Sequence, residues 1–160
     1  MIRDATRADW PAVLALNAAW VHYLSPMDEA RLAALASAAC YFRVVEQDGA
    51  VAAFLLAFRK GAPYDGAIFR RYCEEAEDFL YLDRIVVDAR HHAHGLASHL
   101  YDDAEAFARG AGLRRILCEV YVNPPNNISL HFHDRRGFRE TGRVEQSGKI
   151  ASLLELALRA

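Results

Sequence analysis

Apolar side chains recur at every third or fourth position in several stretches of the chain, and this spacing predicts helices that bury one face. The first stretch follows Thr6, a good N-cap residue, carries Pro11 in its opening turn, and is ended by Ser25-Pro26. Its apolar stripe consists of Trp10, Val13, Leu14, Leu16, Ala18 and Val21. The other predicted helices are Met27–Ala38, Leu96–Ala111, which Gly112 ends, and Asn126–Arg136, which Gly137 ends.

Shorter apolar runs that are bounded by turn residues predict strands. Gln47-Asp48-Gly49 and Ser147-Gly148 each separate two such runs and are typical of hairpin turns. The predicted strands are Met1–Thr6, Tyr41–Glu46, Ala50–Phe58, Phe79–Val87, Arg115–Val122, Phe138–Val144 and Ile150–Leu158. Strands and helices in this order predict one α/β domain over residues 1–160, built on a single mixed sheet.

The connection Gly61–Asp78 is long, polar and aromatic, and we expect a short helix within it around Ala67–Cys73. Long connections in compact domains often form lids or walls of functional sites. Its carboxylates either attract a cationic substrate or form an ordinary solvated face, and they are Asp65, Glu74, Glu75, Glu77 and Asp78.

Composition narrows the class of protein. The formal net charge is −2, so no global basic field attracts nucleic acid or an anionic membrane. No apolar run approaches the roughly 20 residues of a membrane span, and the opening MIRDATRADW lacks the apolar core of a secretory signal. Cys40, Cys73 and Cys118 lie far apart and form no disulfide or zinc-binding pattern. We therefore expect a reduced, cytoplasmic protein without nucleic-acid or membrane partners.

The stretch RHHAHGLASHL, from Arg90 to Leu100, joins a predicted strand to a predicted helix. The first N–H groups of a helix have no partner within it, and its N-terminus carries about half a positive charge. Small residues there let a phosphate group approach the backbone, and Ala93, Gly95 and Ala97 are small. The stretch therefore favours an anion-binding site at the start of the helix.

Two other interpretations of this stretch stay open. His91, His92 and His94 have a spacing that can supply metal ligands, and imidazole suits Zn²⁺. No carboxylate or cysteine within the stretch completes such a site, so a second pair, His131 and His133, would have to contribute. Alternatively, the histidines are solvated and the stretch only begins a helix.

Two motifs resemble those of the GNAT N-acetyltransferase superfamily. RIVVDARHHAHGLASHLYDDAEAFA is similar to its cofactor motif, Arg/Gln-x-x-Gly-x-Gly/Ala after a strand that ends in valine. The matching residues are His92-Ala93-His94-Gly95-Leu96-Ala97, with His92 in place of Arg or Gln. NNISLHFHDRRGF is similar to Asn-x-x-Ala-x-x-x-Tyr followed by Gly-Phe, with Ser129 in place of alanine and His133 in place of tyrosine. The order of elements also agrees, and FLYLDRIVV and EVYVNPPNNIS resemble a branch of bacterial acetyltransferases.

The resemblance implies a GNAT fold, with a mostly antiparallel mixed sheet, flanking helices and two splayed central strands, here Phe79–Val87 and Arg115–Val122. It implies acetyl-CoA as co-substrate and no metal. The pantetheine arm would lie in the gap between the splayed strands, and the pyrophosphate would bind at the start of the following helix. The implied cofactor-binding residues are Ile85, Val86, Val87, His92, Ala93, His94, Gly95, Leu96, Ala97, Ser98, Asn126, Ser129 and His133.

Acetylation of an amine by a thioester requires removal of a proton from the ammonium group, a donor for the developing oxyanion, and departure of a thiolate. Several peptide-amine acetyltransferases of the superfamily carry a glutamate base on the second splayed strand, where this chain has Glu119; Asp83 on the first strand is the other candidate. A backbone N–H of Val86 or Val87 would serve the oxyanion. His133 stands where the superfamily often has a tyrosine general acid.

Each of these roles has an alternative. Glu119 could instead pair with Arg84 or face the solvent, and Asp83 could pair with Arg84 or with a neighbouring loop. A shift of strand phase by one residue would exchange which side chains face the gap. His133 could only pack against the cofactor, and Asn126 could only cap a helix.

The predicted function is transfer of an acetyl group from acetyl-CoA to a primary amine of a small molecule or peptide, by direct attack on the thioester. One alternative is a GNAT-fold module that binds CoA or a protein without turnover, and another is a histidine-rich metal-binding protein. The resemblance to the superfamily also implies a homodimer, with the final hairpin contributing to the interface.

Overall fold

The structure is a computed structural model that describes residues 1–20 and 24–159. Seven strands form one sheet in the order β1-β2-β3-β4-β5-β7-β6. Their bounds are β1 (Ile2–Asp4), β2 (Tyr41–Gln47), β3 (Ala50–Arg59), β4 (Phe79–Val87), β5 (Arg115–Asn123), β6 (Arg139–Gln146) and β7 (Lys149–Ala157). Every neighbouring pair is antiparallel except the parallel pair β4–β5. The predicted α/β class and the mixed, mostly antiparallel sheet are confirmed.

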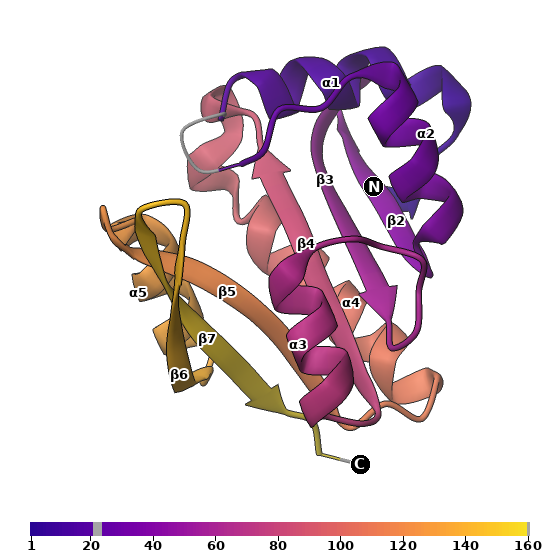
Figure 1. The fold of residues 1–160 in the computed structure, drawn as a ribbon. Helices are drawn as coiled ribbons and strands as arrows, with labels where there is room; N and C mark the ends of the chain where they lie inside the picture. The colour runs from indigo at the N-terminus through magenta and orange to yellow at the C-terminus, as the bar shows by residue number, and fades with distance from the viewer. Residues whose placement is uncertain (21–23, 160) are drawn as a thin grey trace.

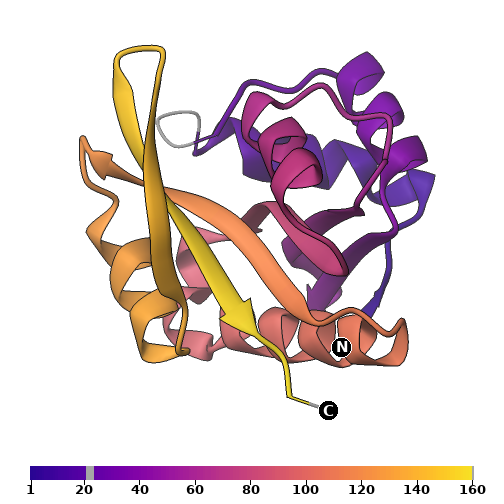
Figure 2. The ribbon, with the colours of Figure 1, turned by 60° about the horizontal axis from the view of Figure 1, so that its bottom comes forward.

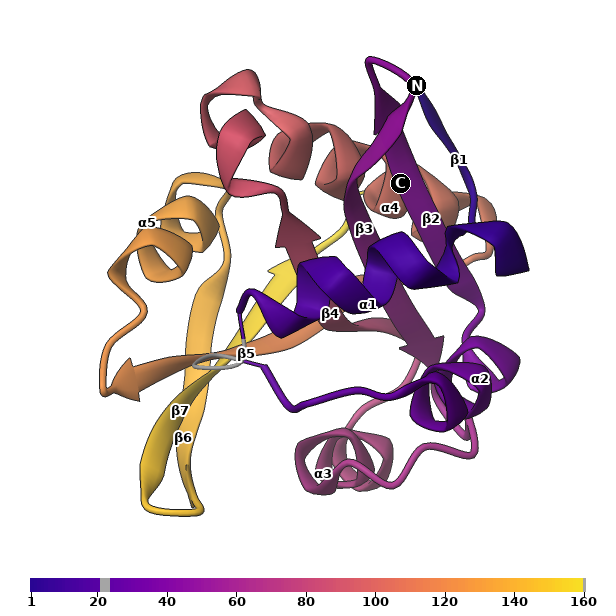
Figure 3. The same ribbon diagram turned by 90° about the horizontal axis from the view of Figure 1, so that it is seen from above.

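Five α-helices among the described residues cover the two faces of the sheet (Figures 1 and 3). On one face lie α1 (Trp10–Ala18), α2 (Glu29–Ala38) and α3 (Ala67–Glu75). On the opposite face lie α4 (Leu96–Gly110) and α5 (Asn127–Arg135). Figure 2 shows α4 beneath the sheet and the hairpin β6–β7 standing at its end.

The first helix begins later than the sequence predicts. Thr6 is followed by a short 3-10 helix, η1 (Arg7–Asp9), and α1 starts only at Trp10. The Thr6 N–H donates to the Asp9 carboxylate at 2.7 Å, so an acidic side chain inside the first turn satisfies the free N–H group. Val21, which is predicted to continue the apolar stripe, lies outside the described residues.

The parallel contact between β4 and β5 is short. Only Phe79–Tyr81 of β4 pair with Arg115–Leu117 of β5. Beyond Tyr81 the two strands diverge, as Figure 1 shows, while β4 remains paired with β3 and β5 with β7. The predicted splay of the two central strands is therefore present, and it leaves one edge of β4 without a neighbouring strand.

A β-bulge interrupts β4 at Asp83. Leu82 lies opposite Ala57 and Arg84 lies opposite Leu56, so Asp83 is an extra residue without a partner in β3. As a result, Tyr81 and Arg84 lie on the same face of the sheet although they are three positions apart.

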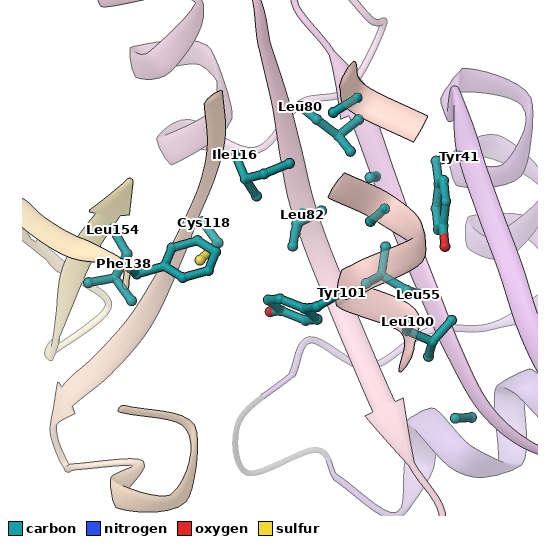
Figure 4. Packing of buried hydrophobic residues seen from close by; sticks show 14 of the residues in the cluster. Tyr41, Leu55, Leu80, Leu82, Leu100, Tyr101, Ile116, Cys118, Phe138 and Leu154 are labelled. Atoms are coloured by element: carbon teal, nitrogen blue, oxygen red, sulfur yellow. The ribbon is translucent and has the colours of Figure 1, made fainter. Parts of the chain in front are cut away.

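The core fills both faces. On the α4 face, buried side chains from the sheet pack against one side of α4, and Figure 4 shows Leu100 and Tyr101 of this helix among them. On the other face, Phe58, Phe69 and Tyr81 form an aromatic cluster under α3. Within residues 1–20 and 24–159, no helix is long and apolar enough to cross a membrane.

Truncation in the α4 core tests this packing. Leu100 is completely buried, so Leu100→Ala should lower the free energy of unfolding by about 2–5 kcal/mol through lost burial and a residual cavity. Ile128→Ala removes an exposed side chain and should change it by less than about 0.5 kcal/mol. Urea unfolding of both variants measures the difference, and equal values would contradict the described core.

Candidate active site

A cavity of about 730 Å³ passes through the sheet in the gap between β4 and β5. On the α3 face its walls include Tyr64, Tyr81 and Glu119. On the α4 and α5 face they include Tyr101 and His133. The volume is in the range of ordinary small-molecule sites, and groups on opposite faces of the sheet can reach the same bound molecule through the gap.

Strand alternation decides which β5 side chains face α3. Leu117 packs in the core cluster under α3, whereas Cys118 and Val120 pack in the cluster under α4. Glu119 and Tyr121 follow the phase of Leu117, because successive residues of a strand point to opposite faces. Burial raises the pKa of the Cys118 thiol, so this neighbour of Glu119 is an inert core residue.

Glu119 is a carboxyl group without a cationic partner among the described residues. The Tyr81 hydroxyl donates to its two oxygens at 2.7 and 2.8 Å. Burial raises the pKa of Glu119 to about 8; the hydrogen bond from Tyr81 opposes this shift, and the charge of Asp83 adds to it. At neutral pH the group is therefore mostly protonated, and it exchanges its proton within the working range of an enzyme.

Asp83, the second predicted carboxylate, is in a different environment. Its Oδ2 accepts from Arg84 Nε at 2.7 Å and its Oδ1 accepts from the Tyr64 hydroxyl at 2.6 Å, and both members of the ion pair are buried. Arg84 also donates to Asn17 Oδ1 at the end of α1 and to the backbone oxygen of Ser25. For Asp83 the sequence left two alternatives, pairing with Arg84 or with a neighbouring loop, and the structure has both, since Tyr64 belongs to the connection before α3.

His133 lies across the gap from Glu119 and is 4% exposed. Its Nδ1 is 2.7 Å from the backbone oxygen of Ser129, and its Nε2 is 2.7 Å from the Tyr101 hydroxyl. Burial lowers the pKa of His133, so the neutral imidazole is favoured. Both ring nitrogens are thus engaged within the protein.

The start of α4 meets the cavity. Gly95 precedes the helix with φ +71°, a left-handed conformation that suits glycine. Gly95, Ala97 and Ser98 line the cavity. Backbone and small side chains thus form this part of the wall, as an anion-binding helix start requires.

The histidines before α4 belong to a 3-10 helix, η2 (Ala89–His94), and are engaged in contacts within the protein. His92 Nε2 is 3.0 Å from the Val87 backbone oxygen, and its ring stacks on Trp20. His91 and His94 face each other, with 3.2 Å between their Nδ1 atoms. No group of three or more His, Cys, Asp or Glu side chains in residues 1–20 and 24–159 is arranged to hold a metal ion.

Most of the predicted cofactor-binding residues line the cavity, but His94 and Leu96 do not. Leu96 is buried in the α4 core, and the backbone of Ala93 lies in η2. Asn126 Oδ1 accepts the Ser129 N–H at 3.3 Å and so caps α5. The predicted residues that line the cavity are Ile85, Val86, Val87, His92, Gly95, Ala97, Ser98, Asn126, Ser129 and His133.

Residues 1–138 match the sequence profile of the acetyltransferase (GNAT) family. The chain belongs to this family. Among curated proteins, none has a matching sequence. The GNAT fold accounts for the splayed strands and for the helix that starts at the cavity.

Solved structures of similar fold cover nearly the whole chain. Ard1 from Thermoplasma volcanium has a TM-score of 0.81 at 17% identity, over 100% of this chain and 98% of Ard1. The ribosomal-protein-S18-alanine N-acetyltransferase from Escherichia coli has a TM-score of 0.76 at 17% identity, over 100% and 94% of the two chains. yncA from Salmonella typhimurium, determined with its cofactor acetyl-CoA, has a TM-score of 0.75 at 22% identity, over 99% and 94%.

Three tyrosines of this GNAT site are not apparent from the sequence motifs. Tyr64 and Tyr81 bind the two carboxylates, and Tyr101 binds His133. One local signal is present: Tyr101 lies at i+4 from Ala97 and i−3 from Ala104 on the apolar face of a helix. The partner of Tyr81, Glu119, lies on a strand 38 positions away. The distant partner of Tyr64 leaves no such local signal.

The acidic residues of the connection Gly61–Asp78 form a solvated face. Asp65 pairs with Arg31 at 2.7 Å, Glu75 pairs with Arg71, and Glu77 pairs with Lys60. The cavity instead meets the start of this connection and of α3, through Tyr64, Gly66, Ala67 and Ile68. The expectation of a wall is confirmed for that part of the segment.

The buried Glu119 should make stability depend on pH. Its pKa is about 8 in the folded protein against 4.5 ordinarily, so between these values folding retains a proton that the unfolded chain has lost, and stability falls as pH rises. Glutamine has no such proton. Glu119→Gln should therefore lie within about 1 kcal/mol of the wild type near pH 5 and exceed it by about 4–5 kcal/mol above pH 8.5.

Urea unfolding of both proteins from pH 5 to 9 measures this difference. Glu74→Gln, a change at an exposed carboxylate of α3, is the control and should run parallel to the wild type. A Glu119→Gln curve that also runs parallel would show that Glu119 titrates as an ordinary glutamate.

Proposed function

We propose that this GNAT protein transfers the acetyl group of acetyl-CoA to a primary amine by direct attack of the amine on the thioester. The observation that carries the proposal is Glu119, a buried carboxyl group with no cationic partner among the described residues and a pKa of about 8. It lines a cavity that opens to the start of α4 on the other face of the sheet. A base and an anion-binding helix start thus share one cavity.

The cofactor side is formed by main chain and small side chains. Acetyl-CoA supplies the activated acyl group, and yncA of similar fold was determined with it. Gly95, Ala97 and Ser98 would hold the pyrophosphate at the start of α4. The edge of β4 that lacks a neighbouring strand, from Ile85 to Val87, would pair with the amide groups of the pantetheine arm. The arm then lies in the gap between β4 and β5.

Glu119 is the general base of the proposed reaction. It takes a proton from the ammonium group of the acceptor, and the amine nitrogen attacks the thioester carbon. A C–N bond forms, the C–S bond breaks, and the thiolate leaves with the bonding electron pair. The nitrogen still carries one surplus proton after the attack, and it releases this proton to solvent to give the neutral amide. A carboxyl group with a pKa near 8 is a stronger base than an ordinary carboxylate, which suits removal of a proton from an ammonium group. A backbone N–H of Val86 or Val87 would donate to the oxyanion.

Asp83 takes a supporting role in this proposal. Its charge is compensated by Arg84, and its second oxygen accepts from Tyr64. Through these contacts Asp83 holds Tyr64 in the cavity wall on the α3 face, and through Arg84 it is connected to Asn17 near the end of α1. The two carboxyl groups thus lie in different environments, Asp83 in a buried ion pair and Glu119 without a cationic partner among the described residues, and the proposal gives them different tasks.

The alternative is a module that binds CoA without turnover. His92 stands where the superfamily prefers Arg or Gln, and the contacts of its ring with Val87 and Trp20 reduce what it can offer to phosphate. Binding and transfer therefore need separate tests.

Acetyl-CoA should stabilise the protein. A ligand at about 100 times its dissociation constant adds about 2.7 kcal/mol, which for a domain of this size raises the midpoint of thermal unfolding by roughly 5–10 °C. Scanning calorimetry with acetyl-CoA, CoA and Zn²⁺ measures the shift. If neither acetyl-CoA nor CoA raises the midpoint, the transferase interpretation and the CoA-binding interpretation are both wrong. A shift with Zn²⁺ alone would support the metal-binding interpretation.

Replacement of the base should abolish transfer but not cofactor binding. Glu119→Gln should lower kcat by about 10²–10⁴-fold while keeping the thermal shift with acetyl-CoA. In the wild type, kcat/KM should increase with pH, with the midpoint of the increase near 8, the pKa of Glu119. In Glu119→Gln this increase should be absent. A panel of alkyl, aromatic and peptide amines, with release of free CoA thiol as readout, supplies the acceptor.

Glu74→Gln is the matched control and should keep the activity of the wild type. Acetyl-CoA binding without acetylation of any amine in the panel would favour the non-catalytic module. Full activity of Glu119→Gln would remove Glu119 as the base.

A further inference from the structure

We propose that Tyr101 and His133 present a hydrogen-bond acceptor, and not a proton donor, to the cofactor side of the cavity. The Tyr101 oxygen would receive an N–H group of the pantetheine arm, and His133 would act as the positioning residue that sets this polarity. This inference rests on the proposed use of acetyl-CoA. It reverses the role of general acid that the resemblance implied for His133.

Tyr101 comes from α4 and lies beneath the gap between β4 and β5. Figure 4 shows its ring between the two strands, with Leu82 on the β4 side and Cys118 and Phe138 on the β5 side. It lines the cavity together with His133 from α5. Tyr101 is 2% exposed, so water hardly reaches its hydroxyl group in the structure.

The tautomer of His133 follows from its contacts. The Ser129 backbone oxygen can only accept a hydrogen bond, and it is 2.7 Å from His133 Nδ1. Nδ1 therefore carries the ring proton and donates it. Burial disfavours the imidazolium form, and the nearby Arg136 guanidinium disfavours it further.

No carboxylate contacts the imidazole ring among the described residues. The groups that face it are the Tyr101 hydroxyl from α4, Ser129 and Phe132 within α5, Arg136 after α5, and Phe138 before β6. A neutral imidazole with its proton on Nδ1 has a lone pair on Nε2. The Tyr101 hydroxyl, 2.7 Å away, donates to that lone pair.

The hydroxyl proton of Tyr101 is therefore directed at His133 and away from the cavity. Only the lone pairs of its oxygen remain for a bound molecule. To donate to a thiolate, Tyr101 would have to leave Nε2 as a buried acceptor without a partner, which is unfavourable. A thiol with a pKa of roughly 8.5 needs little help to leave as thiolate near neutral pH, so solvent can supply its proton afterwards.

Tyr101→Phe tests the proposal because it removes the oxygen and keeps the ring. We expect the KM and the dissociation constant for acetyl-CoA to rise by about 3- to 10-fold, as for loss of one hydrogen bond, while kcat stays within about twofold. Tyr41→Phe is the matched control. Its hydroxyl belongs to the same core cluster but donates to Asp103 outside the cavity, so it should leave both acetyl-CoA constants unchanged.

Two kinetic results would overturn the proposal. If Tyr101→Phe slowed turnover by about two orders of magnitude or more while KM stayed unchanged, Tyr101 would be a proton donor. If KM, the dissociation constant and kcat all stayed unchanged, the pair would be structural only.

Nitrogen-15 spectra of the wild-type imidazole groups provide a test that does not depend on a variant. Between pH 6 and 8.5, His133 should show a protonated Nδ1 and an unprotonated Nε2; a proton on Nε2 would overturn the proposal. If wild-type protein fails to bind acetyl-CoA, the proposed function fails, whereas an altered tautomer with intact binding defeats only this inference.

Discussion

The short parallel contact between β4 and β5 is the constraint on which the site depends. Each strand is paired along most of its length on its other side, β4 with β3 and β5 with β7, so closing the gap would require the two halves of the sheet to move as units. Three paired residues hold the strands together at one end. A strand edge without a neighbour normally invites unwanted association; here it faces an internal cavity, where a bound molecule can use its hydrogen-bonding groups.

The sheet also separates the chemistry into two compartments. Glu119, Tyr64 and Tyr81 lie on the α3 face, where burial stabilises the protonated form of the Glu119 carboxyl group. Tyr101, His133 and the start of α4 lie on the opposite face, where neutral hydrogen bonds and backbone groups prevail. The gap is the only connection that the proposed reaction needs, because the acyl carbon has to be reached from one side while the rest of the cofactor is held from the other.

Local patterns in the sequence predicted most of the helices and strands correctly. The bounds predicted for β4 are the observed ones, and those of the other six strands and of the helices after α1 differ by a few residues at most. The resemblance indicated Glu119 on the second splayed strand, but the sequence left the phase of this strand open, and the core contacts of Leu117 and Cys118 decide it. Alternation failed at Asp83, because a bulge depends on how β3 and β4 fit together and leaves no mark in the sequence of β4 alone.

Local sequence patterns also could not predict contacts between segments that are far apart in the chain. Tyr64 reaches Asp83, and Trp20 stacks on His92, only after the connections between these elements have folded back over the sheet. The motif correctly indicated the stretch that lines the cavity, but it could not show that Leu96 turns into the core or that His92 is held by Val87.

Because of the bulge at Asp83, β4 could lose one residue without changing its pairing with β3. Because Asp83 is the additional residue, a strand shorter by this one position would keep Tyr81, Arg84 and Val86 on their present face. What such a strand would lose is the counter-charge, and the Arg84 guanidinium would remain buried beside Asn17 with no carboxylate to balance it. Loss of residue 83 during evolution would therefore be expected together with replacement of Arg84 by an uncharged residue, and the two positions would change as a unit.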